Sequence, residues 1–250
     1  MIIVTFGVRM NVKLRGVVLN VLKYNDKHNI SHIYTREMGM MPFVVRQGTT
    51  AAAAVRRALM MPLSVIEFEA SVVPSRELST LHDVRRAVPL ASIYADPVKN
   101  AVAMFISELL SHTIQEREPN EGLYRYIESA VQLLEASNRG TANFHICFLY
   151  HLGSFIGIQP DVGSYREGYW FNMNDGVFMP YSAVGARFLP PEQAQVIKLL
   201  SRMTFENMHL FRFNREQRNI MLDTIIAYYR IHNSTIGTLR SPEILKQLFV

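Results

Sequence analysis

The chain has 250 residues, of which 49% are hydrophobic, with 26 Lys and Arg against 21 Asp and Glu and a single cysteine. This composition excludes collagen-like, disulfide-framework and broadly disordered chains, and the length suits one large domain or two modest ones. Cys147 has no partner within the chain, so we expect a reducing compartment. No apolar run approaches the roughly 18 residues that span a bilayer, and residues 2–4 are too short for a secretory signal. We therefore expect a soluble, cytoplasmic protein with no membrane partner.

The formal net charge of +5 is unevenly distributed along the chain. Residues 1–86 hold 12 Lys and Arg against 6 Asp and Glu, a balance of +6, whereas residues 87–250 hold 14 against 15, a balance of −1. A positive excess confined to one segment indicates an acidic partner, with nucleic acid first among the candidates. A merely solvated basic face would give the same numbers, so charge alone leaves both interpretations open.

The first third of the chain has the pattern of short β-strands. Apolar and β-branched runs occupy residues 17–22, 30–35, 41–45 and 63–73, and Asn25-Asp26 supplies turn chemistry between the first two runs. Four or five strands in about 75 residues fit a small closed barrel better than an open sheet, because closure removes unpaired edges. We predict a five-stranded barrel of the OB type, with an SH3-like barrel as the alternative that the sequence leaves open.

After Pro89 the apolar residues recur at helical spacing. Helix starts are indicated at Asp96-Pro97, Pro119-Asn120, Asn143, Pro190-Pro191, Asn214 and Ser241-Pro242. Between the third and fourth of these helices, Asn174-Asp175-Gly176 separates two aromatic runs and predicts a β-hairpin. The predicted fold class is α+β, with an OB-type domain at residues 1–86 followed by a mostly α-helical domain at residues 87–250 that carries a small hairpin insert.

The chain lacks the motifs of several enzyme classes. It has no Gly-x-x-x-x-Gly-Lys loop, no Gly-x-Gly-x-x-Gly fingerprint, no Gly-x-Ser-x-Gly elbow and no His-Glu-x-x-His pair. One cysteine cannot build a thiolate zinc site, and His145 and His151 face different directions on a predicted helix. Glu116, Glu118 and Glu121 surround a helix start, where carboxylates stabilise the helix dipole. We therefore predict no catalytic residue, no bound metal and no cofactor.

Cations and aromatic residues alternate through the predicted barrel. The residues that we predict to bind DNA are Lys13, Arg15, Lys23, Tyr24, Lys27, Tyr34, Arg36 and Arg46, followed by Arg56 and Arg57 in an alanine-rich connector. Small barrels hold single strands with cations near the phosphates and aromatic faces on the bases, each stacked base being worth about 1–3 kcal/mol. We expect Phe43 to fill the barrel core and Tyr24, which lies beside turn residues, to be exposed.

The order of these features resembles the RecO family. In the barrel the resemblance rests on residues 16–19 (Gly-Val-Val-Leu), 24–26 (Tyr-Asn-Asp), 33–39 (Ile-Tyr-Thr-Arg-Glu-Met-Gly), 44–48 (Val-Val-Arg-Gln-Gly) and 62–67 (Pro-Leu-Ser-Val-Ile-Glu). In the helical part it rests on Phe144, residues 151–153 (His-Leu-Gly), 157–160 (Gly-Ile-Gln-Pro) and 239–241 (Leu-Arg-Ser), and Leu245. The ordered combination covers nearly the whole chain from Lys13 onward.

This resemblance implies a bacterial, nucleoid-associated DNA repair and recombination mediator that is not an enzyme. Such a protein would bind single- and double-stranded DNA, anneal complementary strands and, together with RecR, help RecA replace single-stranded-DNA-binding protein. The helical domain would bind the acidic, aromatic-ended C-terminal tail of single-stranded-DNA-binding protein in an apolar pocket with a cationic rim. The candidates for the cationic rim are Arg125, Arg139 or Arg212, and those for the apolar lining are Phe144, Phe148 or Leu152; the sequence does not choose among them.

The chain departs from the family at three places. Many RecO proteins carry a four-cysteine zinc site, whereas residues 160–182 contain no cysteine. The resemblance thus implies a zinc-free variant, in which packing comes from Tyr169, Trp170, Phe171 and Phe178. The basic loop after the third strand is reduced to residues 47–51. Met10 lies where family members tend to start, so we expect residues 1–9 to be an upstream extension.

Two alternatives belong to other functional classes. A metal-dependent nuclease would use the barrel to hold its substrate and would need clustered carboxylates or histidines around a divalent metal. An interaction scaffold would use the basic barrel to contact an acidic protein instead of nucleic acid. Cleavage of labelled strands in Mg²⁺ or Mn²⁺ would favour the nuclease, and failure to bind single-stranded DNA at low salt would favour the scaffold.

Overall fold

The structure, a computed structural model, describes residues 10–73, 75–181 and 187–248. The chain forms two compact units. The first comprises the described residues up to Ala95 together with Ile106–Glu135, and the second comprises Asp96–Phe105 and the described residues from Ala136 onward. The first unit thus contains helical segments as well as strands. The domain boundary at residues 86 and 87 stays a prediction, and the interpretation of residues 1–9 lies outside the described residues.

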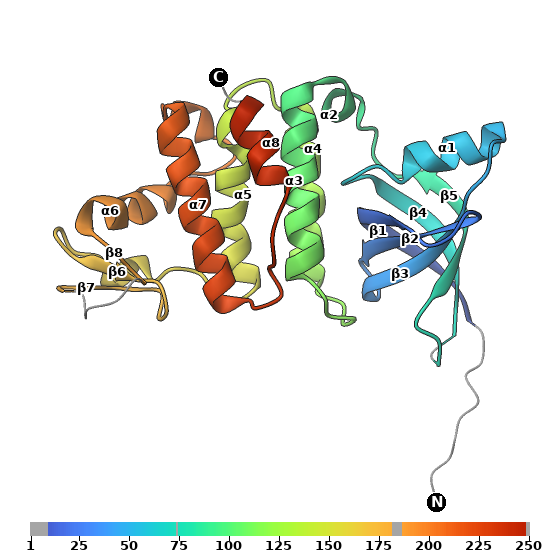
Figure 1. The fold of residues 1–250 in the computed structure, drawn as a ribbon, viewed down its shortest axis with the longest axis horizontal. Helices are drawn as coiled ribbons and strands as arrows, with labels where there is room; N and C mark the ends of the chain where they lie inside the picture. The colour runs from blue at the N-terminus through green and yellow to red at the C-terminus, as the bar shows by residue number, and fades with distance from the viewer. Residues whose placement is uncertain (1–9, 74, 182–186, 249–250) are drawn as a thin grey trace, which may run out of the picture. The chain divides into compact units, whose positions relative to one another are not determined.

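Five strands of the first unit form a small barrel (Figure 1). The strands are β1 (Met10–Lys23), β2 (His28–Thr35), β3 (Gly39–Arg46), β4 (Val65–Val72) and β5 (Ser79–Arg86). They close in the order β1-β2-β3-β5-β4, and the closing contact consists of two parallel residue pairs, Phe43 with Ser79 and Val44 with Thr80. This strand order is that of an OB-type Greek-key barrel, so the predicted α+β class and barrel type are confirmed.

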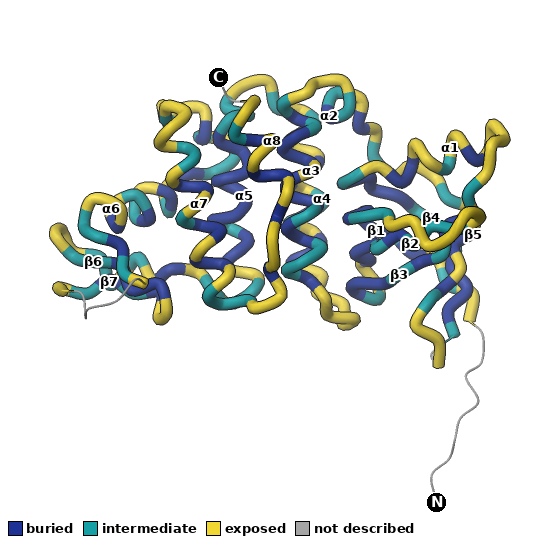
Figure 2. Tube along the Cα trace, viewed as in Figure 1, coloured by how far each residue is buried: buried dark blue, intermediate teal, exposed yellow. Residues whose placement is uncertain are grey.

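The interior of the barrel is filled by alternate residues of the strands. Phe43 is fully buried and meets Phe68 edge-on, with ring centroids 5.0 Å apart, as expected for a core residue. Helix α1 (Ala51–Leu59) adds Leu59 to this core, although most of the helix is exposed (Figure 2). Thr50 caps α1 by accepting a hydrogen bond from the backbone N–H of Ala53 at 3.2 Å. The alanine-rich connector is therefore a helix that covers the barrel core.

The turn between β2 and β3 explains the Thr-Arg-Glu-Met-Gly motif. The Thr35 hydroxyl donates to the carbonyl of Gly39 at 2.9 Å and accepts from the N–H of Met38 at 3.1 Å, which closes the turn. Gly39 has a φ of 65°, and a Cβ there would lie 2.5 Å from the carbonyl oxygen of Glu118. The N–H of Met40 donates to the Glu116 carbonyl at 2.9 Å. Only glycine lets the backbone of residues 116–118 pack against this turn.

Three helices contribute to the first unit beside the strands. They are α2 (Ala91–Ala95), the part of α3 (Pro97–Thr113) that begins at Ile106, and α4 (Glu121–Ala136) up to Glu135. The Ser107 hydroxyl of α3 donates to the Leu19 carbonyl of β1. The Glu135 carboxylate of α4 accepts from the backbone N–H groups of Ser92 and Ile93, both at 2.8 Å, and so caps α2.

The second unit is mainly helical and includes a small sheet (Figure 1). Its elements are the α3 segment up to Phe105, α5 (Thr141–Phe155), the 3₁₀ turn η1 (Val162–Ser164), β6 (Trp170–Asn172), β7 (Val177–Met179), β8 (Phe188–Leu189), α6 (Pro191–Leu200), the 3₁₀ turn η2 (Met208–Leu210), α7 (Arg215–His232) and α8 (Ser241–Leu248). The predicted hairpin is the antiparallel pair β6 and β7, and β8 adds a third strand on the other edge of β6.

Aromatic residues pack the small sheet against the rest of the second unit. Phe171 and Phe178 are buried, with ring centroids 4.9 Å apart. Phe171 lies 5.7 Å from Tyr228 of α7, and Phe178 lies 5.1 Å from Tyr165. Tyr169 and Trp170 are half-buried. Two of the four aromatic residues expected to replace metal packing therefore lie in a hydrophobic cluster.

Candidate nucleic-acid interface

Five of the predicted DNA-binding cations lie near the ends of β1 and β3 and in the last turn of α1, at one edge of the barrel. We call this set the basic rim: Lys23, Lys27, Arg46, Arg56 and Arg57. Backbone contacts hold it together. Gln47 donates its N–H to the Lys27 carbonyl at 2.8 Å. The Arg56 guanidinium donates to the Arg46 carbonyl at 3.2 Å, and the Arg57 guanidinium donates to the Gly48 carbonyl at 2.6 Å.

The positive charge of the basic rim is mostly unpaired. Lys23 contacts Asp26 at 3.1 Å, but both side chains are highly exposed and such a pair contributes little. Within the described part of the chain, no carboxylate lies within 4 Å of the charged groups of the other four rim residues. Five cations and one carboxylate give this edge a local charge of +4. It is the part of the barrel best suited to polyanions.

The turn between β1 and β2 presents an aromatic face beside the basic rim. Tyr24 is 62% exposed, and its N–H donates to the His28 carbonyl at 3.2 Å. Asn25 shapes the turn, because its side-chain oxygen accepts from the N–H groups of Lys27 at 2.9 Å and His28 at 2.8 Å. The exposure expected for Tyr24 is therefore present, and its ring is free to stack on a base.

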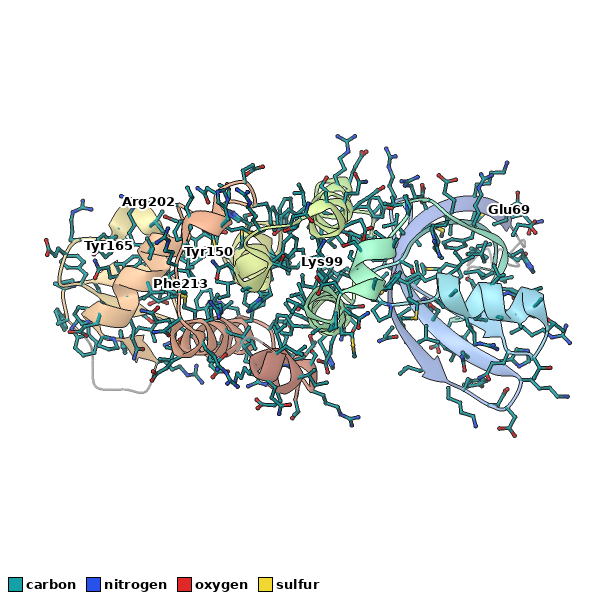
Figure 3. The ribbon with its side chains drawn as sticks, turned by 90° about the horizontal axis from the view of Figure 1, so that it is seen from above. Glu69, Lys99, Tyr150, Tyr165, Arg202 and Phe213 are labelled. Carbon is teal, nitrogen blue, oxygen red and sulfur yellow. The ribbon has the colours of Figure 1, made fainter. Side chains whose placement is uncertain are left out.

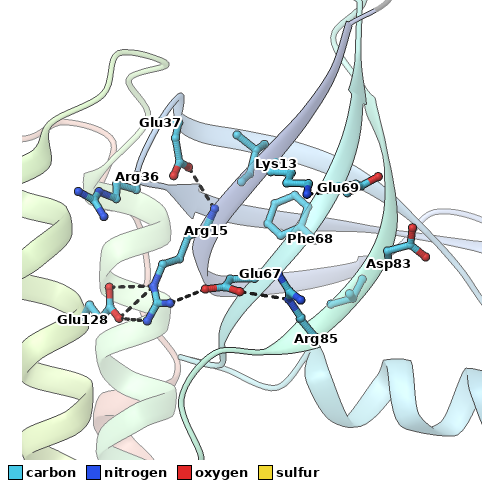
Figure 4. A pocket seen from close by; sticks show the side chains of 12 residues that line it. Lys13, Arg15, Arg36, Glu37, Glu67, Phe68, Glu69, Asp83, Arg85 and Glu128 are labelled. Atoms are coloured by element: carbon cyan, nitrogen blue, oxygen red, sulfur yellow. Dashed lines mark hydrogen bonds and ion pairs between the residues drawn. The ribbon is translucent and has the colours of Figure 1, made fainter.

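Three other predicted cations lie in a separate groove of about 890 Å³ on the outer face of the barrel (Figure 4). We call this the acid–base groove. Its charged lining consists of four cations and five carboxylates: Lys13, Arg15, Arg36 and Arg85, and Glu37, Glu67, Glu69, Asp83 and Glu128. The carboxylates therefore outnumber the cations, so the groove does not attract phosphate by net charge.

Arg15 is the most strongly engaged cation of this groove (Figure 4). Its guanidinium contacts Glu67 of β4 at 2.7 Å and Glu128 of α4 at 2.5 Å. The hydrogen bond to Glu128 is the main reason that the pKa of Arg15 lies above its usual value. Because the side chains are only 27% and 15% exposed, phosphate binding by Arg15 would leave Glu128 without its partner. The interpretation of Arg15 as a phosphate ligand is therefore not supported by its surroundings.

Lys13 and Arg36 are paired more loosely. Lys13 lies 3.9 Å from Glu69, and Arg36 contacts Glu121 of α4 at 2.8 Å. Glu121 also accepts from Arg125 at 2.7 Å, and the hydrogen bonds from Arg125 and Arg36 lower the pKa of this carboxyl. Arg125, predicted to bind a protein partner, therefore belongs to the same ion-pair cluster as Arg36.

The prediction that Tyr34 stacks on a base is wrong. Tyr34 is 1% exposed, and its ring lies against Tyr124 of α4 with centroids 6.2 Å apart. Burial raises the pKa of Tyr34 to about 12, and its hydroxyl donates to the Asn120 carbonyl at 3.4 Å. The side chain points outward from the barrel, but α4 covers it.

The predicted partner pocket on α5 is also wrong. Phe144, Phe148 and Leu152 are each no more than 1% exposed, because apolar residues surround α5 on all sides. Arg139 and Arg212 are exposed in the second unit, but the three apolar residues expected beside them offer almost no accessible surface to a ligand. Cys147 is buried on the same helix, and burial raises the pKa of its thiol to about 12.

The second unit contains a different apolar groove, which was not predicted from the sequence. It has a volume of about 270 Å³ and lies between α6 and α7, with Leu199 37% exposed and Ile220 49% exposed. Phe213, labelled in Figure 3, lines it where the chain enters α7. Both α6 and α7 also bury apolar residues against the core of the second unit. In the sequence the apolar residues of the groove are interspersed with these core residues, so they do not form a separate pattern. The rim neighbours His28 and Gln47 were likewise missed, although the strand alternation of β2 could have placed His28 on the outer face.

Two further features of the described residues bear on other functional classes. No group of three or more His, Cys, Asp or Glu side chains within them is arranged to hold a metal ion. None of their helices combines the length and apolar character that a membrane span requires.

Comparisons with known proteins agree with these features. Residues 10–87 match the domain family described as Recombination protein O N terminal, and residues 94–235 match Recombination protein O C terminal. The chain belongs to the RecO family. It is 38% identical to the DNA repair protein RecO of Phocaeicola vulgatus over 237 residues, which cover 95% of this chain and 98% of that protein. It is 32% identical to DNA repair protein RecO of Porphyromonas gingivalis strain W83, across 96% of this chain and 100% of the relative. For DNA repair protein RecO of Flavobacterium psychrophilum the identity is 30%, with the same coverage. The chain is thus a member of a family of DNA repair and recombination proteins.

Proposed function

We propose that this RecO-family protein is a non-enzymatic mediator of DNA repair, which binds single- and double-stranded DNA and anneals complementary strands. The basic rim is the observation that carries the proposal, because its four unpaired cations lie together beside an exposed tyrosine. Family membership supports the further role of helping RecA to replace single-stranded-DNA-binding protein together with RecR. We place this activity in the bacterial cytoplasm at the nucleoid.

The mechanism follows from the charges. Two complementary strands repel each other through their phosphates, and cations that neutralise phosphates release condensed counterions and lower this repulsion. The basic rim would hold one strand by its backbone, leaving the base edges free to pair with an incoming strand. Tyr24 would stack on one base and keep it from re-forming structure within its own strand.

An annealing assay tests this assignment. We expect the variant Lys27→Glu, Arg46→Glu, Arg56→Glu to anneal two complementary oligonucleotides at least tenfold more slowly than the wild type at 50 mM salt, because the rim becomes negative. Lys13→Glu, Arg36→Glu, Arg85→Glu is the matched control, since it reverses the same number of charges at cations that already face carboxylates, and it should retain most of the annealing rate. Equal annealing by the wild type and the rim variant would remove the rim from the mechanism. Strand cleavage in Mg²⁺ that scales with protein would favour a nuclease.

We also propose the groove between α6 and α7 as the binding site for the acidic, aromatic-ended tail of single-stranded-DNA-binding protein. Its apolar lining, which includes Leu199, Phe213 and Ile220, suits the aromatic side chain at the end of the tail. The one charged lining residue that the structure describes is Glu192, so cations that face the acidic residues of the tail must come from outside the groove. This site replaces the one predicted on α5.

Calorimetric titration with the tail peptide tests the groove. Ile220→Glu should abolish the heat of binding, because it places a carboxylate in the apolar groove beside an acidic ligand. Ile244→Glu on α8 is the control, since Ile244 is 47% exposed and Ile220 49%. Binding that survives Ile220→Glu unchanged would place the tail elsewhere.

A further inference from the structure

The outer face of β1, β2 and β3 carries a second feature of interest, a hollow of about 240 Å³ within the first unit. It is lined by Asn20, His32, Met40, Pro42, Ser111, Ile114, Gln115 and Arg117. This volume is large enough to admit the planar ring of one nucleobase. The lining combines polar groups with three apolar side chains.

Strand pairing sets the polar side of the hollow. A register shift between Val18 and Asn20 brings Asn20 directly opposite His32 on the outer face. The imidazole Nδ1 of His32 lies 2.6 Å from the side-chain oxygen of Asn20. In a neutral imidazole one nitrogen donates and the other accepts, and a carboxamide does both. Whichever way the pair is oriented, one donor and one acceptor remain for a ligand.

This mixed chemistry distinguishes a base from a phosphate. A phosphate needs donors and positive charge, but burial lowers the pKa of His32 and favours its neutral form. The edge of a nucleobase offers donors and acceptors side by side, which matches the amide and imidazole. Met40, Pro42 and Ile114 supply an apolar wall for the flat face of the base. Arg117 is an exposed residue of the lining, and its guanidinium can stack on a base or contact the adjoining phosphate.

The hollow also lies along the path of a strand bound to the basic rim. His32 pairs with Pro42, and four residues along the same two strands His28 pairs with Arg46 of the rim. Four residues of strand span about 13 Å. A single strand that contacts the rim can therefore reach the hollow within a few nucleotides.

We infer that the hollow between Asn20, His32 and Arg117 holds one unstacked nucleobase of single-stranded DNA. This inference rests on the proposed function and deepens it, because it gives the protein a reason to prefer single strands. A base inside a duplex cannot enter without leaving its pair, so double-stranded DNA would bind through the rim alone. During annealing, the captured base would be released as it pairs with the incoming strand.

Blocking the hollow without changing any charge tests the inference. Ser111→Tyr fills it from α3, and His32→Ala removes its imidazole. Ser154→Tyr is the matched control, because Ser111 and Ser154 each bond the carbonyl three residues earlier, at 2.7 and 2.8 Å. We expect each hollow variant to bind single-stranded oligonucleotide about tenfold more weakly, with duplex affinity changed less than twofold. The slope of log affinity against log salt should not change, since no phosphate contact is lost.

A fluorescent base gives a second readout. An oligonucleotide with one 2-aminopurine should brighten on binding the wild type and the Ser154→Tyr control, as the base leaves its stack, and should not brighten with Ser111→Tyr or His32→Ala. Wild-type affinity and brightening in both hollow variants would overturn the inference while leaving the proposed function standing. Absence of any single-strand binding by the wild type at 50 mM salt would instead overturn the proposed function.

Discussion

The basic rim and the acid–base groove lie on the same barrel and contain similar numbers of cations, yet their electrostatic character differs. In the groove every arginine or lysine has a carboxylate nearby, supplied by β4, β5, α4 or the turn after β2. In the rim the cations come from a turn, a strand end and a helix end, where the neighbouring partners are backbone carbonyls. The positive charge counted in the sequence is therefore available for binding only at the rim. Counting cations along a chain overstates a binding surface wherever the fold supplies counter-charges.

The largest expected effect is a loss of stability when an ion pair of the acid–base groove is broken. Glu128→Ala should destabilise the first unit by about 2 kcal/mol, because Arg15 would keep a partly buried charge without its closest partner. Glu69→Ala, which removes a pair 3.9 Å apart between exposed side chains, should cost less than about 0.5 kcal/mol. Urea unfolding followed by circular dichroism measures both. Equal effects of the two substitutions would mean that the groove charges are no more structural than a surface pair.

Tyr24 tests the aromatic part of the rim. Tyr24→Ala should weaken single-strand binding about 20-fold, which corresponds to about 1.8 kcal/mol and lies within the range for one stacked base. Tyr24→Phe should restore most of the affinity, because it keeps the ring. Fluorescence anisotropy with a labelled oligonucleotide at fixed salt is the measurement. A similar loss for both substitutions would assign the effect to the hydroxyl group and contradict stacking.

The second unit contains an ionisable group that burial keeps neutral, unlike the paired charges of the acid–base groove. His145 of α5 is buried, and burial followed by the nearby Arg218 charge lowers its pKa to about 3, against 6.5 in the unfolded chain. The unfolded state takes up this proton first, so stability is lost as pH falls below about 6.5. The free energy of unfolding should decrease by about 1.4 kcal/mol from pH 7.5 to pH 5.5 on account of this group. His145→Gln should remove that part of the pH dependence, and an unchanged profile in the variant would assign it to other groups.

The smallest expected effect comes from removing negative charge from the acid–base groove, so that its net charge becomes positive like that of the basic rim. Glu37→Gln, Glu69→Gln, Asp83→Asn removes three negative charges from the groove and leaves its cations in place. Single-strand affinity at 50 mM salt should rise about fivefold, because Lys13 loses its partner Glu69 and the net charge of the groove lining changes from −1 to +2, while Arg36 and Arg85 keep Glu121 and Glu67. A filter-binding titration measures the change. Unchanged affinity would show that the groove lies outside the path of the strand.

Much of the fold was accessible from local sequence signals. Runs of β-branched residues predicted the barrel strands, and Asn174-Asp175-Gly176 predicted the hairpin, because these features depend on neighbours in the chain. The helix α1 was missed because nine residues rich in alanine carry too few apolar positions to show a helical period. Pro190 and Asn214 do lie at the N-caps of α6 and α7, as predicted.

The site was less accessible because it depends on distant contacts. Arg15 and Glu128 are separated by 113 residues, so no local pattern reveals that they pair. Tyr34 lies on the outer face of β2, as strand alternation requires, but alternation cannot distinguish an open face from one covered by α4. Phe144, Phe148 and Leu152 recur at helical spacing, but that spacing cannot distinguish a helix with an accessible apolar face from α5, which is buried on all sides. Composition located the basic segment, and only the fold separated its free cations from its paired ones.

The central claim, that the rim and not the groove contacts DNA phosphates, is tested most directly by the salt dependence of single-strand binding. Each phosphate contact contributes about 0.7 to the slope of log affinity against log salt. The variant Lys27→Ala, Arg46→Ala, Arg56→Ala, Arg57→Ala should reduce this slope by up to about 3, whereas Lys13→Ala, Arg36→Ala, Arg85→Ala should leave it within about 0.7 of the wild type. A reduced slope in the groove variant and an unchanged slope in the rim variant would contradict the account.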